Sequence, residues 1–213
     1  MAFAIILLPI LMAVLAALIP SNRWRPWILP VTGTAHLALT VVALSRPELA
    51  TCRSWLVLDP LGKLILLVVS TLFAFCSFYA VGYLHHRLAR DNRIFCTCLT
   101  AFLGVVRLVT WVHHLGLMWV AIEATTLVTA PLIFFNHTQR SIEATWKYLL
   151  IGSVGIALAL LGTFFLAYAS LHTGMASTLT LEGILAQAPQ LSKPWLHAAF
   201  VLLLVGYGTK MGL

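Results

Sequence analysis

Charge is what this chain has least of. Charged residues make up 9% of its 213 positions, hydrophobic residues make up 61%, and the mean hydropathy is +0.99. So few charges exclude a water-soluble domain of this length. The formal charge of +7 does not indicate nucleic-acid binding, because the basic residues are scattered singly through short polar stretches. The sequence therefore predicts an all-α, polytopic membrane helix bundle.

Cysteine is also rare. The four are Cys52, Cys76, Cys96 and Cys98, of which only Cys52 falls in a loop. Their spacing spells out neither a disulfide framework nor a zinc ligand set, and the two His-His pairs lack the further ligands that a metal site needs. We expect packing cysteines, no metal, no cofactor and no catalytic residues.

Long apolar runs are abundant. Seven of them predict membrane-spanning helices over residues 2–19, 27–44, 61–83, 94–112, 116–135, 144–171 and 195–213. The first run has no basic region before it and no small-x-small cleavage site before Pro20, so we expect a span rather than a signal peptide. Tryptophans at several run edges suit the membrane boundary.

Basic residues are distributed unequally over alternate loops. The loops after the first, third and fifth spans, with the start of the sixth, carry Arg23, Arg25, Arg87, Arg90, Arg93, Arg140 and Lys147. The other side carries Arg46, Arg53 and Lys193, with Lys63 just inside the third span. The positive-inside rule then places the N-terminus outside, in a cell inner membrane.

Glu123 lies inside the apolar run 116–135, about 10 Å from its first residue if the run is helical. A carboxylate at that depth costs several kcal/mol, so we expect it to be protonated, paired with a cation or facing a wet cavity. Each of these states makes Glu123 a candidate for proton handling. The alternative is a structural glutamate that is hydrogen-bonded to a neighbouring helix.

Two lysines also fall at membrane depth. Lys147 lies near the start of the sixth span, and Lys210 lies fifteen residues into the seventh. Three nearby glycines, Gly206, Gly208 and Gly212, surround Lys210 and predict a break or wide turn around that lysine. Both lysines have the alternative of extending their ammonium groups to the interface. We estimate about 12 Å between Glu123 and Lys210 along the membrane normal, so water or a polar side chain must bridge them.

Other polar residues in the spans carry less weight. Thr126 adds a hydroxyl at i+3 from Glu123, on the same helix face. His36 and His197 are able to pass protons or simply to hydrogen-bond a neighbouring helix. Arg107 lies well inside the fourth span, where it either pairs with Glu123 or extends outward towards His113 and His114.

Three stretches carry a family resemblance: HHLGLMWVAIEATTLVTAPLIFF, SIEATWKYLLIGSVGIALALLGTFFLAYA and LLVGYGTKMGL. They resemble the antiporter-like membrane subunits of respiratory complex I and, more closely, the large subunit of formate-hydrogenlyase-type energy-converting nickel–iron hydrogenases. Asp59-Pro60-Leu61-Gly62, at the start of the third span, is also similar. The resemblance covers essentially the whole chain and is densest from His114 to Leu166.

The resemblance implies a role for individual residues. Glu123 matches the family's fifth-helix glutamate and Lys210 the lysine of its broken seventh helix, which together form a proton-relay pair. Lys147 matches a recurrent basic position that opens the sixth helix, whereas Arg107 stands where the family is normally apolar. Such subunits hold no redox centre; they are non-catalytic parts of an oxidoreductase complex that move protons or sodium in response to electron transfer.

The family fold has about fourteen helices in two inverted repeats, of which this chain resembles the incomplete first half. We expect one transmembrane domain over 1–213, with three N-terminal helices in 1–93 and a partial first repeat in 94–213. The implied partners are other membrane-arm and peripheral-arm subunits, the lipid bilayer and a chain that supplies the second half. Two alternatives are a non-conducting scaffold subunit and a subunit of an ion-coupled antiporter or inorganic-carbon transporter.

Overall fold

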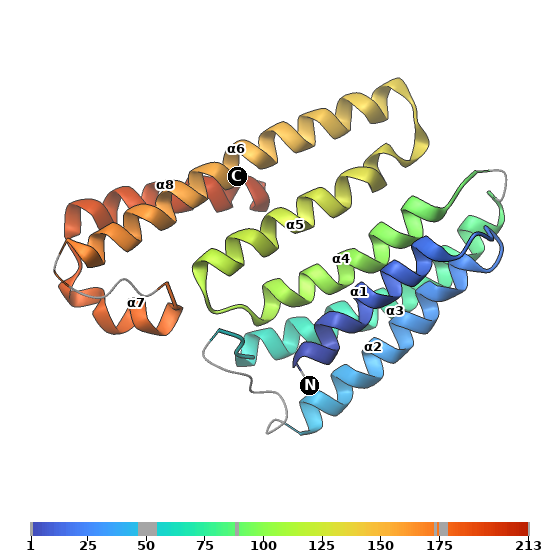
Figure 1. Ribbon diagram of the computed structural model, residues 1–213, viewed down its shortest axis with the longest axis horizontal. Helices are drawn as coiled ribbons and strands as arrows, with labels where there is room; N and C mark the ends of the chain where they lie inside the picture. Colours follow the sequence, from blue (N-terminus) through green and yellow to red (C-terminus); the bar gives the residue numbers. More distant parts are fainter. Residues whose placement is uncertain (1, 47–54, 88–89, 173, 175–178, 213) are drawn as a thin grey trace.

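The computed structural model describes residues 2–46, 55–87, 90–172, 174 and 179–212. A long helix corresponds to each predicted span: α1 (Ala2–Leu18), α2 (Ile28–Ser45), α3 (Pro60–His85), α4 (Arg93–Trp111), α5 (Leu115–Ile133), α6 (Gln139–Leu171) and α8 (Lys193–Met211). A short helix, α7 (Leu181–Gln187), precedes α8 (Figure 1). The all-α helix-bundle prediction is confirmed, while Cys52 and Arg53 lie outside the described residues.

Five stretches are long and apolar enough to cross a membrane: Arg25–Ser45, Pro60–His85, Arg93–Trp111, Leu115–Asn136 and Gln139–Leu171. The apolar part of α1, Phe3–Leu18, is shorter. A multi-pass membrane protein follows from these spans. Whether α1 and α8 also cross, and which side the N-terminus faces, stay predictions.

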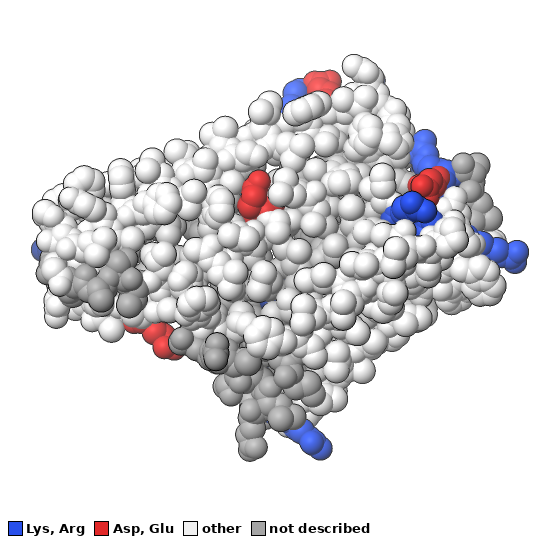
Figure 2. Space-filling model, viewed as in Figure 1, with Lys and Arg blue, Asp and Glu red and all other residues white. Residues whose placement is uncertain are grey.

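The helices are arranged as a row of packed neighbours (Figure 1). α2 packs on α3 and α1 on α4; the row then continues from α4 through α5 and α6 to α8. The connections after α1, α3 and α5 lie at one end of the molecule (Figure 1). Figure 2 shows Lys and Arg gathered at that same end, while the middle of this face is almost uncharged.

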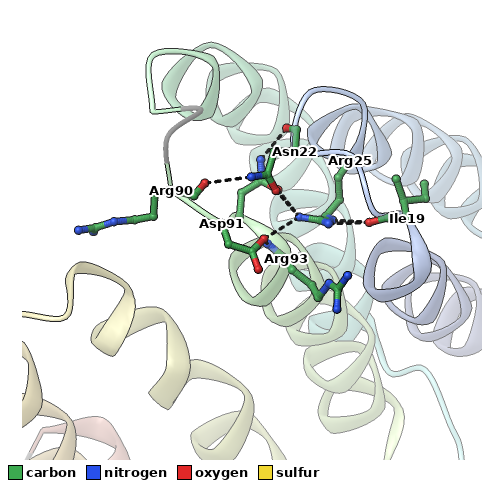
Figure 3. A network of polar contacts seen from close by, with 7 residues as sticks. Ile19, Asn22, Arg25, Arg90, Asp91 and Arg93 are labelled. Carbon is green, nitrogen blue, oxygen red and sulfur yellow. Dashed lines mark hydrogen bonds and ion pairs between the residues drawn. The ribbon is translucent and has the colours of Figure 1, made fainter.

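Arg25 ties together two of the connections at the basic end (Figure 3). Its buried guanidinium donates to the Ile19 carbonyl at 2.6 and 2.9 Å, Asn22 Oδ1 at 2.8 Å, Asn92 Oδ1 at 2.7 Å and Asp91 Oδ1 at 3.0 Å. The Arg93 backbone N–H and the Arg25 guanidinium hold the pKa of Asp91 below its ordinary value. This network fixes the α1–α2 turn against the start of α4.

α6 begins at Gln139, five residues before the predicted span. Thr138 and Ser141 cap its first turn reciprocally, with Ser141 N donating to Thr138 Oγ1 at 3.1 Å and Thr138 N to Ser141 Oγ at 2.9 Å. Its 33 residues correspond to about 50 Å of helix, well beyond the roughly 30 Å hydrocarbon core. The helix is therefore longer than an untilted span requires.

Glycines bring α6 and α8 close together. A Cβ added at Gly206 would lie 2.5 Å from the Ala159 backbone nitrogen, and one at Gly162 would lie 2.9 Å from Leu203 Cγ. The predicted break within the glycine run is wrong, because α8 is continuous from Lys193 to Met211. Close packing against α6 outweighs the low helix propensity of glycine here. Gly212, at φ 85°, ends the helix just after Lys210.

Candidate functional site

Glu123 lies in the middle of α5 and is partly exposed. Its Oε2 atom is buried and has no hydrogen-bond partner among the described residues. None of the described Lys or Arg side chains lies within 4.0 Å of this carboxylate. Acidic colour appears in the middle of the face formed by α5 and α6, in otherwise uncharged surroundings (Figure 2). The glutamate is thus not held in a permanent ion pair within the described chain.

Lys210 reaches from α8 to α5. Its ammonium donates to the hydroxyl of Thr126, which is itself fully buried. Thr126 lies one turn along α5 from Glu123. Lys210 therefore contacts a residue that lies one helical turn from Glu123.

Gly152 of α6 leaves the space through which Lys210 reaches Thr126. A Cβ added to this buried glycine would lie 3.3 Å from Lys210 Nζ and 3.1 Å from Thr126 Cγ2. Both distances are tighter than ordinary van der Waals contact. Glycine at position 152 thus permits the contact between α8 and α5.

Tyr148 and Thr129 extend the polar cluster, and neither was predicted. The Tyr148 hydroxyl lies 2.8 Å from Thr129 Oγ1, and Lys210 Nζ lies 5.9 Å from the centroid of the Tyr148 ring. The spacing of residues along α6 could have indicated Tyr148. Tyr148 is four residues before Gly152, so the two share the face of α6 that approaches Lys210.

Two hollows meet on α5 beside this cluster. One, of about 320 Å³, is lined by Lys210, Tyr148 and Gly152 among others. The second, of about 470 Å³, is lined by Asp59 and His113 at the opposite end of the molecule from the basic loops. Ile122 and Thr125 of α5 line both hollows, so the two hollows adjoin at these side chains.

Lys147 and His197 are not brought to this cluster. The Lys147 ammonium pairs with Glu143 one turn earlier on α6, and the two side chains are 68% and 61% exposed. The extension of its ammonium to the membrane interface stays a prediction. His197 is exposed near the start of α8, thirteen residues and about 20 Å of helix from Lys210. Within the described residues, no group of three His, Cys, Asp or Glu side chains is arranged to hold a metal ion.

Arg107 neither pairs with Glu123 nor extends outward towards His113 and His114. Its side chain is fully buried, so the outward extension is wrong. Its three guanidinium nitrogens lack hydrogen-bond partners among the described residues, and no described carboxylate lies within 4.0 Å. His36 on α2 is also fully buried, and its Nδ1 lies 3.2 Å from Ser70 Oγ on α3. His36 thus hydrogen-bonds a neighbouring helix, which is one of the two roles expected for it from the sequence.

Comparison with known proteins confirms the family resemblance. Residues 113–213 match the family described as NADH:quinone oxidoreductase/Mrp antiporter, TM. The whole chain is 28% identical to 46% of a hydrogenase-4 component F homolog from Methylacidiphilum infernorum. A second relative, NADH-quinone oxidoreductase subunit N from Desulforudis audaxviator, is 31% identical over 74% of the chain and 30% of its own length. The chain thus spans less than half the length of these relatives.

Solved structures share the fold. A chain of the membrane-bound sulfane sulfur reductase, an archaeal respiratory membrane complex, superposes with a TM-score of 0.80 at 14% identity, over 97% of this chain and 44% of that one. A chain of respiratory complex I from Thermus thermophilus gives 0.76 at 22% identity, over 98% and 43%. The bundle is therefore a partial antiporter-like fold.

Proposed function

We propose that this chain is a membrane-arm subunit of a respiratory hydrogenase or of an NADH:quinone oxidoreductase-like complex. In this role it moves protons, or sodium ions, through a relay that includes Glu123 and Lys210. The observation that carries the proposal is the contact between Lys210 and Thr126, one helical turn from Glu123. The implied partners are further membrane-arm and peripheral-arm subunits in a cell inner membrane.

The relay requires a group that both accepts and donates a proton between the two charged residues. A threonine hydroxyl does both, and Thr126 accepts from the Lys210 ammonium one helical turn from Glu123, so we assign the bridging role to Thr126. Because a buried ammonium and a carboxylate each stabilise the charged form of the other, moving either one changes the protonation of both. Such a change is the step by which a distant electron-transfer event would drive proton movement.

The two hollows supply the access that this relay needs. Lys210 lines the first hollow, and the second extends to Asp59 and His113. Thr125, whose hydroxyl donates to the Ile122 carbonyl at 2.6 Å, lines both. We assign Lys147 a peripheral part, because its ammonium is exposed and tied to Glu143.

The test is proton pumping by the purified native complex in sealed vesicles. Glu123→Gln and Lys210→Ala are expected to abolish acidification while leaving assembly with the co-purifying subunits intact. Glu182→Gln and Lys193→Ala remove the same charges from exposed positions outside the cluster and should pump normally. Normal pumping by both relay variants would refute the relay and favour the scaffold reading. Sodium-dependent transport lost in the same variants would identify sodium as the ion.

A further inference from the structure

A hollow of about 450 Å³ opens at the basic end of the molecule, between the α1–α2 turn and the last turns of α3. Its lining includes Arg23, Trp24 and Trp27 from the turn, with Gly82, His85 and His86 from α3. It lies at the end of the spanning helices and far from the Lys210 cluster, and the relay makes no use of it.

The lining offers positive charge and hydrogen-bond donors without a carboxylate. Arg23 is exposed, and none of the described carboxylates lies within 4.0 Å of its guanidinium. Its neighbour Arg25 is buried in the network that fixes this turn (Figure 3). The imidazoles of His85 and His86 are exposed with ring centroids 6.4 Å apart. Arg23 therefore projects from a rigid turn beside two imidazoles, an arrangement that suits a phosphate group.

An apolar track leads from the hollow towards the middle of the bundle. Phe78 lies four residues before Gly82 on α3 and Phe75 lies seven before it, so the three share one helix face. Phe75 is 72% and Phe78 55% exposed, and Trp24 and Trp27 are exposed at the rim. Exposed tryptophans at the end of spanning helices are typical of the boundary between headgroups and acyl chains.

We propose that this hollow binds the phosphate headgroup of an anionic phospholipid, with an acyl chain along the Phe75–Phe78 face of α3. The absence of a carboxylate from its lining favours an anionic over a zwitterionic headgroup. The adjoining aromatic face favours a lipid over a soluble phosphate. Gly82 provides the room, because a Cβ added there meets no atom within 4 Å.

The experiment is native mass spectrometry of the full chain in detergent, titrated in separate arms with dioleoyl phosphatidylglycerol, dioleoyl phosphatidylcholine and inorganic phosphate. We expect phosphatidylglycerol to bind at least fivefold more tightly than phosphatidylcholine, and inorganic phosphate at equal concentration not to displace it. Gly82→Leu, which fills the hollow, and Arg23→Gln should each weaken binding at least threefold. Gly82→Leu replaces glycine with a better helix former in open space, so loss of folding does not explain a loss of binding.

Arg140→Gln is the matched control, since Arg140 is an exposed arginine of the same end but outside the hollow. It should leave binding unchanged. Equal loss in this control would show that binding follows overall charge alone, and the site would be refuted. Equal binding of phosphatidylcholine, displacement by inorganic phosphate, or full binding by Gly82→Leu would each refute it as well.

Discussion

The Lys210 ammonium meets the Thr126 hydroxyl although 84 positions separate them in the chain. The main packing partner of α8 is α6, which in turn packs on α5. The lysine reaches its partner past the α6 backbone at Gly152. The size of the side chain at position 152 therefore controls the contact.

Gly152→Ala should disturb the relay while the fold stays intact. The new methyl group would stand 3.3 Å from Lys210 Nζ and 3.1 Å from Thr126 Cγ2, so the flexible lysine tip must move away from the hydroxyl. We expect proton pumping to fall about tenfold, since small misplacements of a reacting group cost that much or more. The measurement is vesicle acidification by the assembled complex.

Gly82→Ala is the matched control for this change. Both glycines lie in long helices, but a Cβ at Gly82 meets no atom within 4 Å. This variant should pump normally. Equal losses in the two variants would show that any added methyl group impairs the protein, which would contradict the role of Gly152.

Thr126→Val and Thr126→Ser separate the hydroxyl of this residue from its volume. Valine keeps the shape and removes the hydroxyl that accepts from the Lys210 ammonium, so we expect about 1–3 kcal/mol lower stability and a loss of pumping. Serine keeps the hydroxyl and should pump, with about 1 kcal/mol lost for the missing methyl group. Thermal unfolding in detergent measures stability. Normal pumping by the valine variant would exclude the hydroxyl from the relay.

The helices were predictable because apolar length and capping are local properties. Asp59 followed by Pro60 marks the start of α3, where Asp59 accepts from Gly62 N at 2.7 Å. The start of α6 was placed five residues late. The first turns of α6 are helical but polar. A span predicted from hydropathy therefore begins only where the apolar residues begin, several residues after the start of the helix.

The site was only half predictable. Thr126 followed from its i+3 spacing to Glu123, a relation within one helix. The contacts of Lys210 with Thr126 and Tyr148 depend on how α8 and α6 are placed against each other, which no single helix encodes. The helix break predicted at the glycine run is wrong for the same reason. The low helix propensity of Gly206 is outweighed by close packing against Ala159 of another helix.

Arg25→Lys should be far more damaging than Asp91→Asn. The buried Arg25 guanidinium serves four acceptor groups in different directions, and a lysine ammonium cannot reach them all. We expect a loss of about 3 kcal/mol or more for Arg25→Lys, and less than about 1 kcal/mol for Asp91→Asn, whose carboxylate is 66% exposed. Thermal unfolding in detergent measures both.

The Asp91 contribution has a defined pH dependence. Its pKa is lowered in the folded chain by the Arg93 N–H and by Arg25, so its stabilisation is complete above the unfolded value of about 3.9. It is lost as the pH falls through the lowered folded-state pKa. The difference between wild type and Asp91→Asn should therefore be constant near neutral pH and vanish in acid. A difference that grows on acidification would contradict this assignment.

Arg107→Met should stabilise the protein, which is unusual for a substitution of a fully buried residue. The arginine is completely shielded, its three guanidinium nitrogens have no hydrogen-bond partner among the described residues, and no described carboxylate is near. Burying such a charge is costly, and well-packed apolar side chains of similar volume are often more stable by about 1–4 kcal/mol. Arg25→Met is the contrast, because that buried arginine is fully partnered and its loss should destabilise. A fall in unfolding temperature for Arg107→Met would show that the guanidinium is held by a group beyond the described residues.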